Sequence, residues 1–261
     1  MQSKRFPETK SSNDDYYQHR TPVTLDNLQK SQLAAKFKQQ NKFQINVLDL
    51  ACGRSPGFFA LKDYFSQHGI EINYVGIDIS PSIINDNEKT FENYRNAIFI
   101  ALDASNPLNL RDALTPHFAD LIFCQHPQVQ VFGYGGEGVQ NMLRKTLPYY
   151  LSPNGYVYIS CYLLEEWNFI SQLQSNGCRV FPCNEEQKEC LYIHRDQIRP
   201  YEKYVYVSLV PLKVDQLCQK EKVQQETPAL LTCSMFKTVM MDTLTSITNI
   251  CCRRKSGVKK S

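Results

Sequence analysis

Short hydrophobic runs recur along the chain and alternate with segments whose apolar residues have helical spacing. Continuous apolar runs of this length are typical of strands that are buried on both faces of a sheet. They occupy residues 47–50, 72–77, 97–102, 119–124 and 156–161. Strands that alternate with helices predict an α/β fold with a doubly wound, mostly parallel sheet and helices on both faces.

The pattern changes after a helix expected around Trp167. Strand candidates at 178–182, 190–194 and 203–210 follow one another, and no helical pattern separates them. Such a succession favours antiparallel pairing. The mostly parallel sheet is therefore expected to have an antiparallel edge.

The two ends of the chain differ from the central domain, which we expect at residues 24–212. Residues 1–23 are largely polar without a sustained period, which predicts a flexible lead-in or a lid. The apolar spacing from Thr24 to about Asn41 predicts a helix that packs beside the main fold. Residues 213–228 are polar and predict a linker to the remaining segment, 229–261.

The segment 229–261 combines apolar residues at helical spacing with a basic end that follows Cys251 and Cys252. This pattern suits peripheral contact with an anionic membrane or with a partner protein. A helix packed against the central domain, or a loosely ordered extension, explains the same pattern. The sequence leaves these alternatives open.

Charge and cysteine content narrow the class of protein. The net charge is +3, and the basic end at 253–260 carries this excess, so a broad nucleic-acid-binding surface on the central domain is disfavoured. The ten cysteines show no paired C-x-x-C spacing and follow no secretory signal, which predicts reduced thiols in a cytoplasmic protein, without a metal site. No apolar stretch reaches the roughly 18 residues of a membrane-spanning helix.

Acidic residues follow three of the predicted strands. Asp49, Asp78 and Asp103 each come at or directly after an apolar run, and a turn containing Gly53 follows the first of these strands. Because parallel strands place their carboxyl ends at one edge of a sheet, these carboxylates are expected to meet there. A desolvated carboxylate is costly unless it accepts hydrogen bonds or faces a polar ligand. Helix capping or turn formation is the alternative explanation for each residue taken singly.

The order of these motifs resembles that of the class I S-adenosylmethionine-dependent methyltransferases over about residues 24–210. The similar segments are Leu48–Gly53, Gly76–Ser80, Ala101–Ala104, Asp120–Gln128 and Leu151–Tyr156. The resemblance implies a Rossmann-like fold and a reaction that converts S-adenosylmethionine to S-adenosylhomocysteine. The order and spacing of the whole set carry the resemblance, because a single glycine turn is a weak signal.

The same resemblance implies a role for each matching residue. Asp49 would approach the methionine ammonium, and Asp78 would bind the ribose hydroxyls. The remaining cofactor contacts would come from Ala51, Cys52 and Gly53 along the methionine part, from Ile79, Asp103 and Ala104 around the adenine, and from Gln125. This chain departs from the family pattern at Ala51 and Ser55, where glycines are common.

The fourth strand ends at Gln125-His126-Pro127-Gln128, which differs from the tetrapeptide of amino-directed nucleic-acid methyltransferases. His126 is a candidate catalytic base, because the ordinary pKa of histidine lies near neutrality. A structural histidine that bonds the glycine-rich segment 133–138, or a reaction that needs only alignment and no base, are the alternatives. Cys52 and Cys124 are interpreted as small buried hydrophobic residues rather than nucleophiles.

The sequence therefore predicts a methyltransferase whose acceptor is a small molecule or, second, a protein side chain. A Rossmann-type NAD(P)-dependent oxidoreductase also uses a glycine turn and a later ribose-binding acid, but the three-glycine fingerprint is missing here. A cofactor-binding scaffold without catalysis is the third hypothesis.

Overall fold

The computed structural model describes residues 13–127, 134–175, 178–179, 190–194 and 204–209. The chain divides into two compact units, 1–220 and 221–261, and every described residue belongs to the first. The predicted linker and the amphipathic basic segment therefore lie outside the described residues.

A seven-stranded sheet forms the centre of the first unit, with the strand order β3-β2-β1-β4-β5-β9-β8. Strands β1 to β5 pair in parallel, whereas β9 is antiparallel to both β5 and β8. This sheet confirms the predicted doubly wound α/β fold with an antiparallel edge. The strands are β1 (Gln44–Leu50), β2 (Glu71–Asp78), β3 (Ala97–Ala101), β4 (Ala119–Gln125), β5 (Leu151–Cys161), β8 (Cys190–His194) and β9 (Tyr204–Ser208), with a separate short pair of β6 (Gln174–Ser175) and β7 (Cys178–Arg179).

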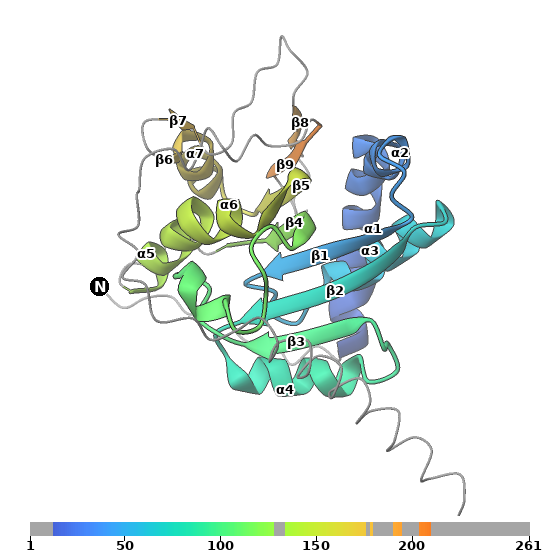
Figure 1. Cartoon of the computed structure of the whole chain (residues 1–261), viewed down its shortest axis with the longest axis horizontal. Coiled ribbons are helices and arrows are strands. Elements are labelled where there is room, and N and C mark those ends of the chain that lie inside the picture. Colours follow the sequence, from blue (N-terminus) through green and yellow to red (C-terminus); the bar gives the residue numbers. More distant parts are fainter. Residues whose placement is uncertain (1–12, 128–133, 176–177, 180–189, 195–203, 210–261) are drawn as a thin grey trace, which may run out of the picture. The chain divides into compact units, whose positions relative to one another are not determined.

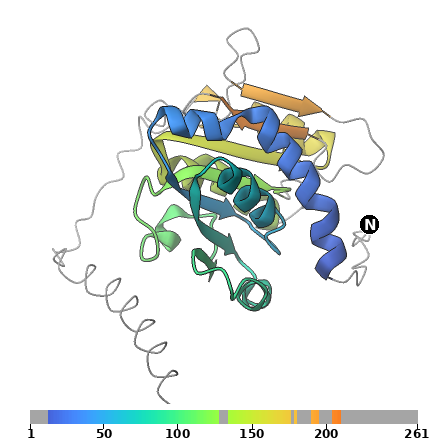
Figure 2. The same ribbon diagram turned by 90° about the vertical axis from the view of Figure 1, so that its right-hand side faces the viewer.

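Helices cover both faces of the sheet, and each face has its own hydrophobic core (Figures 1 and 2). One core joins the sheet to α1 (Asn13–Ser31), α2 (Leu33–Gln39), α3 (Gly57–Gln67) and α4 (Pro81–Thr90). The other joins it to α5 (Tyr134–Asn141), α6 (Leu147–Tyr150), α7 (Leu164–Gln172) and the short helix η1 (Pro107–Leu110). A π-helical turn, η2 (Met142–Thr146), lies between α5 and α6. Alternate side chains of each central strand enter opposite cores, which explains the continuous apolar runs.

Helix α1 begins at Asn13, well before the position that the sequence predicts. Residues 13–23 of the expected lead-in are therefore helical. Polar contacts hold the later part of α1 to the sheet: Gln125 Nε2 donates to Thr24 Oγ1 at 2.9 Å, and Asn27 Nδ2 donates to the Tyr158 hydroxyl at 3.1 Å. Both Thr24 and Asn27 are fully buried. Residues 13–23 were not predicted as a helix because they are largely polar and show no sustained apolar period.

The glycine-rich segment is helical over its described part: Gly135, Gly136 and Gly138 belong to α5, and Gly133 lies outside the described residues. The strand predicted at 156–161 begins earlier, since residues 151–155 already belong to β5, where the pairing with β4 is irregular. The position of the helix therefore brings Gly138 toward the edge of the sheet.

The cysteines are only in part as expected. Cys52, Cys124 and Cys161 are buried free thiols, and burial raises the pKa of each. Cys190 on β8 is disulfide-bonded, so the expectation of reduced thiols is wrong for this residue. Over the described ranges, no helix is long and apolar enough to cross a membrane, and no cluster of three or more His, Cys, Asp or Glu side chains offers a metal site.

Candidate cofactor site at the strand ends

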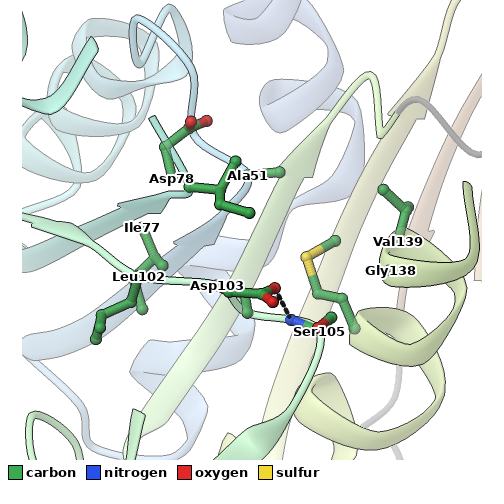
Figure 3. A pocket seen from close by; sticks show the side chains of 11 residues that line it. Ala51, Ile77, Asp78, Leu102, Asp103, Ser105, Gly138 and Val139 are labelled. Atoms are coloured by element: carbon green, nitrogen blue, oxygen red, sulfur yellow. Dashed lines mark hydrogen bonds between the residues drawn. The ribbon is translucent and has the colours of Figure 1, made fainter. Parts of the chain in front are cut away.

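The carboxyl ends of β1, β2 and β3 meet at a cavity of about 170 Å³, which we call the strand-end pocket. Figure 3 shows its side chains converging from these strands and from the helical segment on the other side. Of the predicted cofactor residues, five line it together. The lining consists of Ala51, Ile77, Asp78, Ile79, Leu102, Asp103, Ala104, Ser105, Gly138, Val139 and Met142.

The loop after β1 contains three residues in the left-handed backbone region, and these residues determine its conformation. Ala51, Gly53 and Ser55 have φ values of 56°, 51° and 52°. A left-handed residue other than glycine costs about 1–2 kcal/mol, so the surrounding structure must hold Ala51 and Ser55 in place. Asn87 of α4 does so in part, because its Nδ2 donates to the Gly53 carbonyl at 2.7 Å.

Asn87 is a positioning residue that the sequence analysis missed. It is 1% exposed and stands on the buried face of α4, between Ile84 and Phe91. Its only signal in the sequence is a polar residue at an apolar position of a helix. That signal does not say which loop the side chain will bind.

Asp78 connects the first two loops of the site. Its Oδ2 accepts the backbone N–H of Gly53 and its Oδ1 accepts that of Ser80, both at 2.9 Å. A carboxylate has about four lone-pair positions, so each oxygen can still accept a hydroxyl from a ligand. Asp78 thus both shapes the loop and presents acceptors at the pocket.

Asp103 faces the same pocket from the end of β3. Its Oδ1 accepts the backbone N–H of Ser105 at 2.8 Å, as the dashed line in Figure 3 shows, and this leaves Oδ2 for a ligand. Ile79 lines the pocket with 63% of its surface exposed, and Val139 and Met142 line it as well. The pocket therefore combines apolar walls with two carboxylates.

Asp49 lies beneath the loop, outside the strand-end pocket, and is 1% exposed. Its Oδ2 accepts the hydroxyl of Tyr74, whereas Oδ1 is buried and has no hydrogen-bond partner among the described residues. Burial is the largest cause that raises the pKa of Asp49 to about 8. An incoming cationic group would satisfy the second oxygen and favour the ionised carboxylate.

His126 follows β4, where its backbone N–H donates to the Ser160 carbonyl at 2.8 Å and its φ is 53°. Both ring nitrogens are buried and have no hydrogen-bond partner within the described part of the chain. Burial first, and then the positive charge of Arg20, lower the pKa of His126 to about 3. The imidazole is therefore neutral around pH 7.

Three buried polar side chains that lack partners within the described ranges lie at or near the carboxyl ends of neighbouring strands. Asp49 Oδ1, His126 and the Ser160 hydroxyl are buried without hydrogen bonds among the described residues, and they come from the adjacent strands β1, β4 and β5. Gln125 lies there too, bonded to Thr24, and like Cys52, Gly53 and His126 it is not part of the pocket lining. Buried polar groups normally have partners, so this region suits the polar end of an elongated ligand.

The pH dependence of stability tests the protonated state of Asp49. The pKa of Asp49 is about 8 in the folded chain, whereas an aspartate in the unfolded chain has a pKa of about 3.9. Between these two pH values the free energy of unfolding falls as pH rises, by about 1.4 kcal/mol per pH unit. His126 acts with the opposite sign, but only below its unfolded pKa of about 6.5. We therefore expect the Asp49 contribution to lower the free energy of unfolding by about 2 kcal/mol between pH 6.5 and 8.

Urea unfolding of the wild-type chain and of Asp49→Asn at pH 6.5 and 8.0 measures this contribution. Asparagine keeps an acceptor for Tyr74 and removes the titrating group, so its stability should change less over this interval. Asp86→Asn, at an exposed position of α4, is the control and should follow the wild type. Equal pH dependence in Asp49→Asn and the wild type would show that Asp49 is ionised throughout.

Comparison with known proteins identifies the class of protein to which this pocket belongs. The profile of a family described as "Methyltransferase domain" matches residues 41–226, more than half of the chain. The chain belongs to this family: it is a class I S-adenosylmethionine-dependent methyltransferase with a Rossmann-like fold, and S-adenosylmethionine is its cofactor. Family membership decides against the oxidoreductase hypothesis.

Solved structures give weaker likenesses. The C-methyltransferase domain of the citrinin polyketide synthase is 15% identical over 65% of this chain and 46% of that domain, with a TM-score of 0.42. The CurJ carbon methyltransferase is 12% identical over 63% of this chain and 47% of that one, also with a TM-score of 0.42. A SAM-dependent methyltransferase from Aquifex aeolicus is 14% identical over 67% of this chain and 87% of that one, with a TM-score of 0.40.

The chain thus spans less than half the length of the first two structures. No curated protein sequence matches the chain.

Proposed function

We propose that the chain binds S-adenosylmethionine with its adenosine part in the strand-end pocket and transfers the methyl group to a small molecule. The observation that carries this proposal is that the carboxylates of Asp78 and Asp103 line one pocket with the exposed side chain of Ile79. When bound, the cofactor supplies an electrophilic methyl group on a sulfonium sulfur.

Each residue has a defined task in this arrangement. Asp78 accepts hydrogen bonds from the two ribose hydroxyls and from the Gly53 N–H, and Ile79 packs on the adenine. Oδ2 of Asp103 accepts a hydrogen bond from the adenine amino group, and Ala104 lies against the edge of the adenine ring. Support comes from the hydrogen bonds that fix both carboxylates and leave acceptor positions unused.

The methionine part is proposed to extend from this pocket over the loop at Ala51, Cys52 and Gly53. Asp49 then lies on the side of the ammonium group, and Gln125 stands at the far end. The buried Asp49 oxygen without a partner supports this direction. A Cβ added at Gly53 would meet no atom within 4 Å, so the ligand has room to approach the backbone there.

The acceptor is proposed to bind near His126, beyond the methionine part. A pKa of about 3 keeps this imidazole neutral but makes it a weak proton acceptor, so we assign it hydrogen bonding and alignment rather than full deprotonation. The ring nitrogens are buried, and α1 is bonded to the neighbouring Gln125. An enclosed acceptor end suits a small molecule better than a protein side chain.

Two further predictions concern the rest of the chain. Contact of the segment 229–261 with an anionic membrane or a partner protein is proposed from the sequence alone. A cytoplasmic location is proposed on the same basis.

Calorimetric titration with S-adenosylhomocysteine, and with NAD as the negative control, tests the proposal. Asp103→Asn is the sharpest variant, because its amide oxygen can still accept the Ser105 N–H while its NH₂ group replaces the acceptor that faces the ligand. We expect this variant to bind S-adenosylhomocysteine about 10- to 100-fold more weakly, the usual effect of losing a hydrogen bond to a charged group.

Asp63→Asn, on the exposed side of α3, is the matched control and should bind like the wild type. Failure of the folded wild-type chain to bind S-adenosylhomocysteine would contradict the proposed site as a whole. Unchanged binding by Asp103→Asn would contradict the role of Asp103 alone.

A further inference from the structure

One hydrogen bond joins the loop that follows β3, at the strand-end pocket, to the π-helical turn η2. The hydroxyl of Thr146 donates to the backbone carbonyl of Ala104 at 2.7 Å, and Thr146 is fully buried. Ala104 itself lines the pocket. A residue far along the chain therefore holds the backbone of the loop that faces the ligand.

The helical segment that carries Thr146 faces the pocket or the segment after β3 at every fourth residue. Met142 lines the strand-end pocket, Thr146 binds Ala104, and the hydroxyl of Tyr150 donates to the Pro107 carbonyl at 2.8 Å. Met142 and Thr146 are the first and last residues of η2. Single π-helical turns within helices often occur at functional sites, because they change which side chains face a neighbouring element.

The Ala104–Ser105 peptide plane is held from both sides. Its C=O accepts the Thr146 hydroxyl, and its N–H donates to Asp103 Oδ1 at 2.8 Å. Because a peptide unit is planar, rotation of this plane moves both groups together. Loss of the Thr146 bond therefore frees the plane that fixes the direction of the Asp103 carboxylate.

We propose that Thr146 is a positioning residue for adenine recognition: it locks the Ala104–Ser105 peptide, and the peptide aims Asp103 Oδ2 at the base. This inference rests on the proposed cofactor site. The π-helical turn belongs to the base-binding site through this bond, although Thr146 does not line the pocket. Loss of the Thr146 bond should therefore weaken the binding of a 6-amino purine more than the binding of a purine without that amino group.

The test compares Thr146→Val, which lacks the donor at nearly equal volume, with Thr146→Ser, which retains it. Calorimetry measures the binding of S-adenosylhomocysteine and of S-inosylhomocysteine, which has an oxygen in place of the 6-amino group. We expect Thr146→Val to lower the affinity for S-adenosylhomocysteine about tenfold or more and to reduce the ratio of the two affinities at least severalfold. Thr146→Ser should restore both values.

Thr90→Val is the matched control, because the Thr90 hydroxyl also donates to a backbone carbonyl, that of Asp86 at 2.9 Å, on α4. Hydrogen exchange of the free chain gives a second, ligand-independent measurement. Thr146→Val should speed exchange of the Ser105 amide, and Thr90→Val should not.

The outcomes separate this inference from the proposed function. If the wild-type chain does not bind S-adenosylhomocysteine, the cofactor site is wrong whatever the exchange data show. If it binds, and Thr146→Val leaves the affinity ratio or the Ser105 exchange rate unchanged, the positioning role of Thr146 is overturned. An equal loss for both nucleosides has the same meaning, since it indicates a general structural defect.

Discussion

Replacing Asp78 by alanine is expected to weaken S-adenosylhomocysteine binding by about a hundredfold or more. The substitution removes the acceptors proposed for the ribose hydroxyls, and hydrogen bonds to a charged group are each worth about 1.5–3 kcal/mol. It also releases the N–H groups of Gly53 and Ser80, which the carboxylate holds at 2.9 Å. Both losses act on the same ligand, so the effect should exceed that of Asp103→Asn.

Calorimetric titration measures this loss, and circular dichroism checks that the variant is folded. Asp86→Ala removes a carboxylate from an exposed position of α4 and should leave the affinity within about twofold of the wild type. An Asp78→Ala variant that is folded and binds with nearly wild-type affinity would place the ribose elsewhere.

Replacing Gly57 by alanine is expected to lower the free energy of unfolding by about 1–3 kcal/mol, which corresponds to a fall of roughly 3–10 °C in Tm. A Cβ at this position would lie 2.3 Å from Phe123 Cε1 and 2.9 Å from Gln125 Oε1. The ring of Phe123 is fully buried and stacks on Tyr158 with a centroid distance of 4.6 Å, so it cannot move aside easily. The start of α3 must shift instead.

Urea and thermal unfolding measure the effect, and Gly53→Ala provides the contrast. An added Cβ at Gly53 meets nothing within 4 Å, so that variant should lose only the cost of a left-handed alanine, about 1–2 kcal/mol, because its φ is 51°. Equal stability of Gly57→Ala and the wild type would mean that Phe123 has room to repack.

The alternation of apolar runs predicted the sheet well, because parallel strands buried on both faces must be almost continuously apolar. The acids at or near the carboxyl ends of β1, β2 and β3 were also visible in the sequence, and the structure brings Asp78 and Asp103 into one pocket. Asp49 lies outside the lining, and its assignment stays a prediction. The early start of α1 was missed, because residues 13–23 are largely polar and show no sustained apolar period.

The positioning residues were not predictable for a related reason. Asn87, Thr146 and Tyr74 act on a loop or a strand that another part of the chain supplies. An isolated asparagine, threonine or tyrosine has many ordinary uses in a helix or strand. Its partner is defined only when the chain has folded.

By itself, the sequence determined the α/β fold and the edge of the sheet at which the acids collect, because strand burial and strand direction follow from local hydrophobic pattern. Only the tertiary structure decided how the loops are held: Ala51 and Ser55 keep left-handed backbones beside the Asn87 contact, and Thr146 fixes the peptide that orients Asp103. Hydrogen bonds between distant segments depend on three-dimensional placement, which no local pattern specifies.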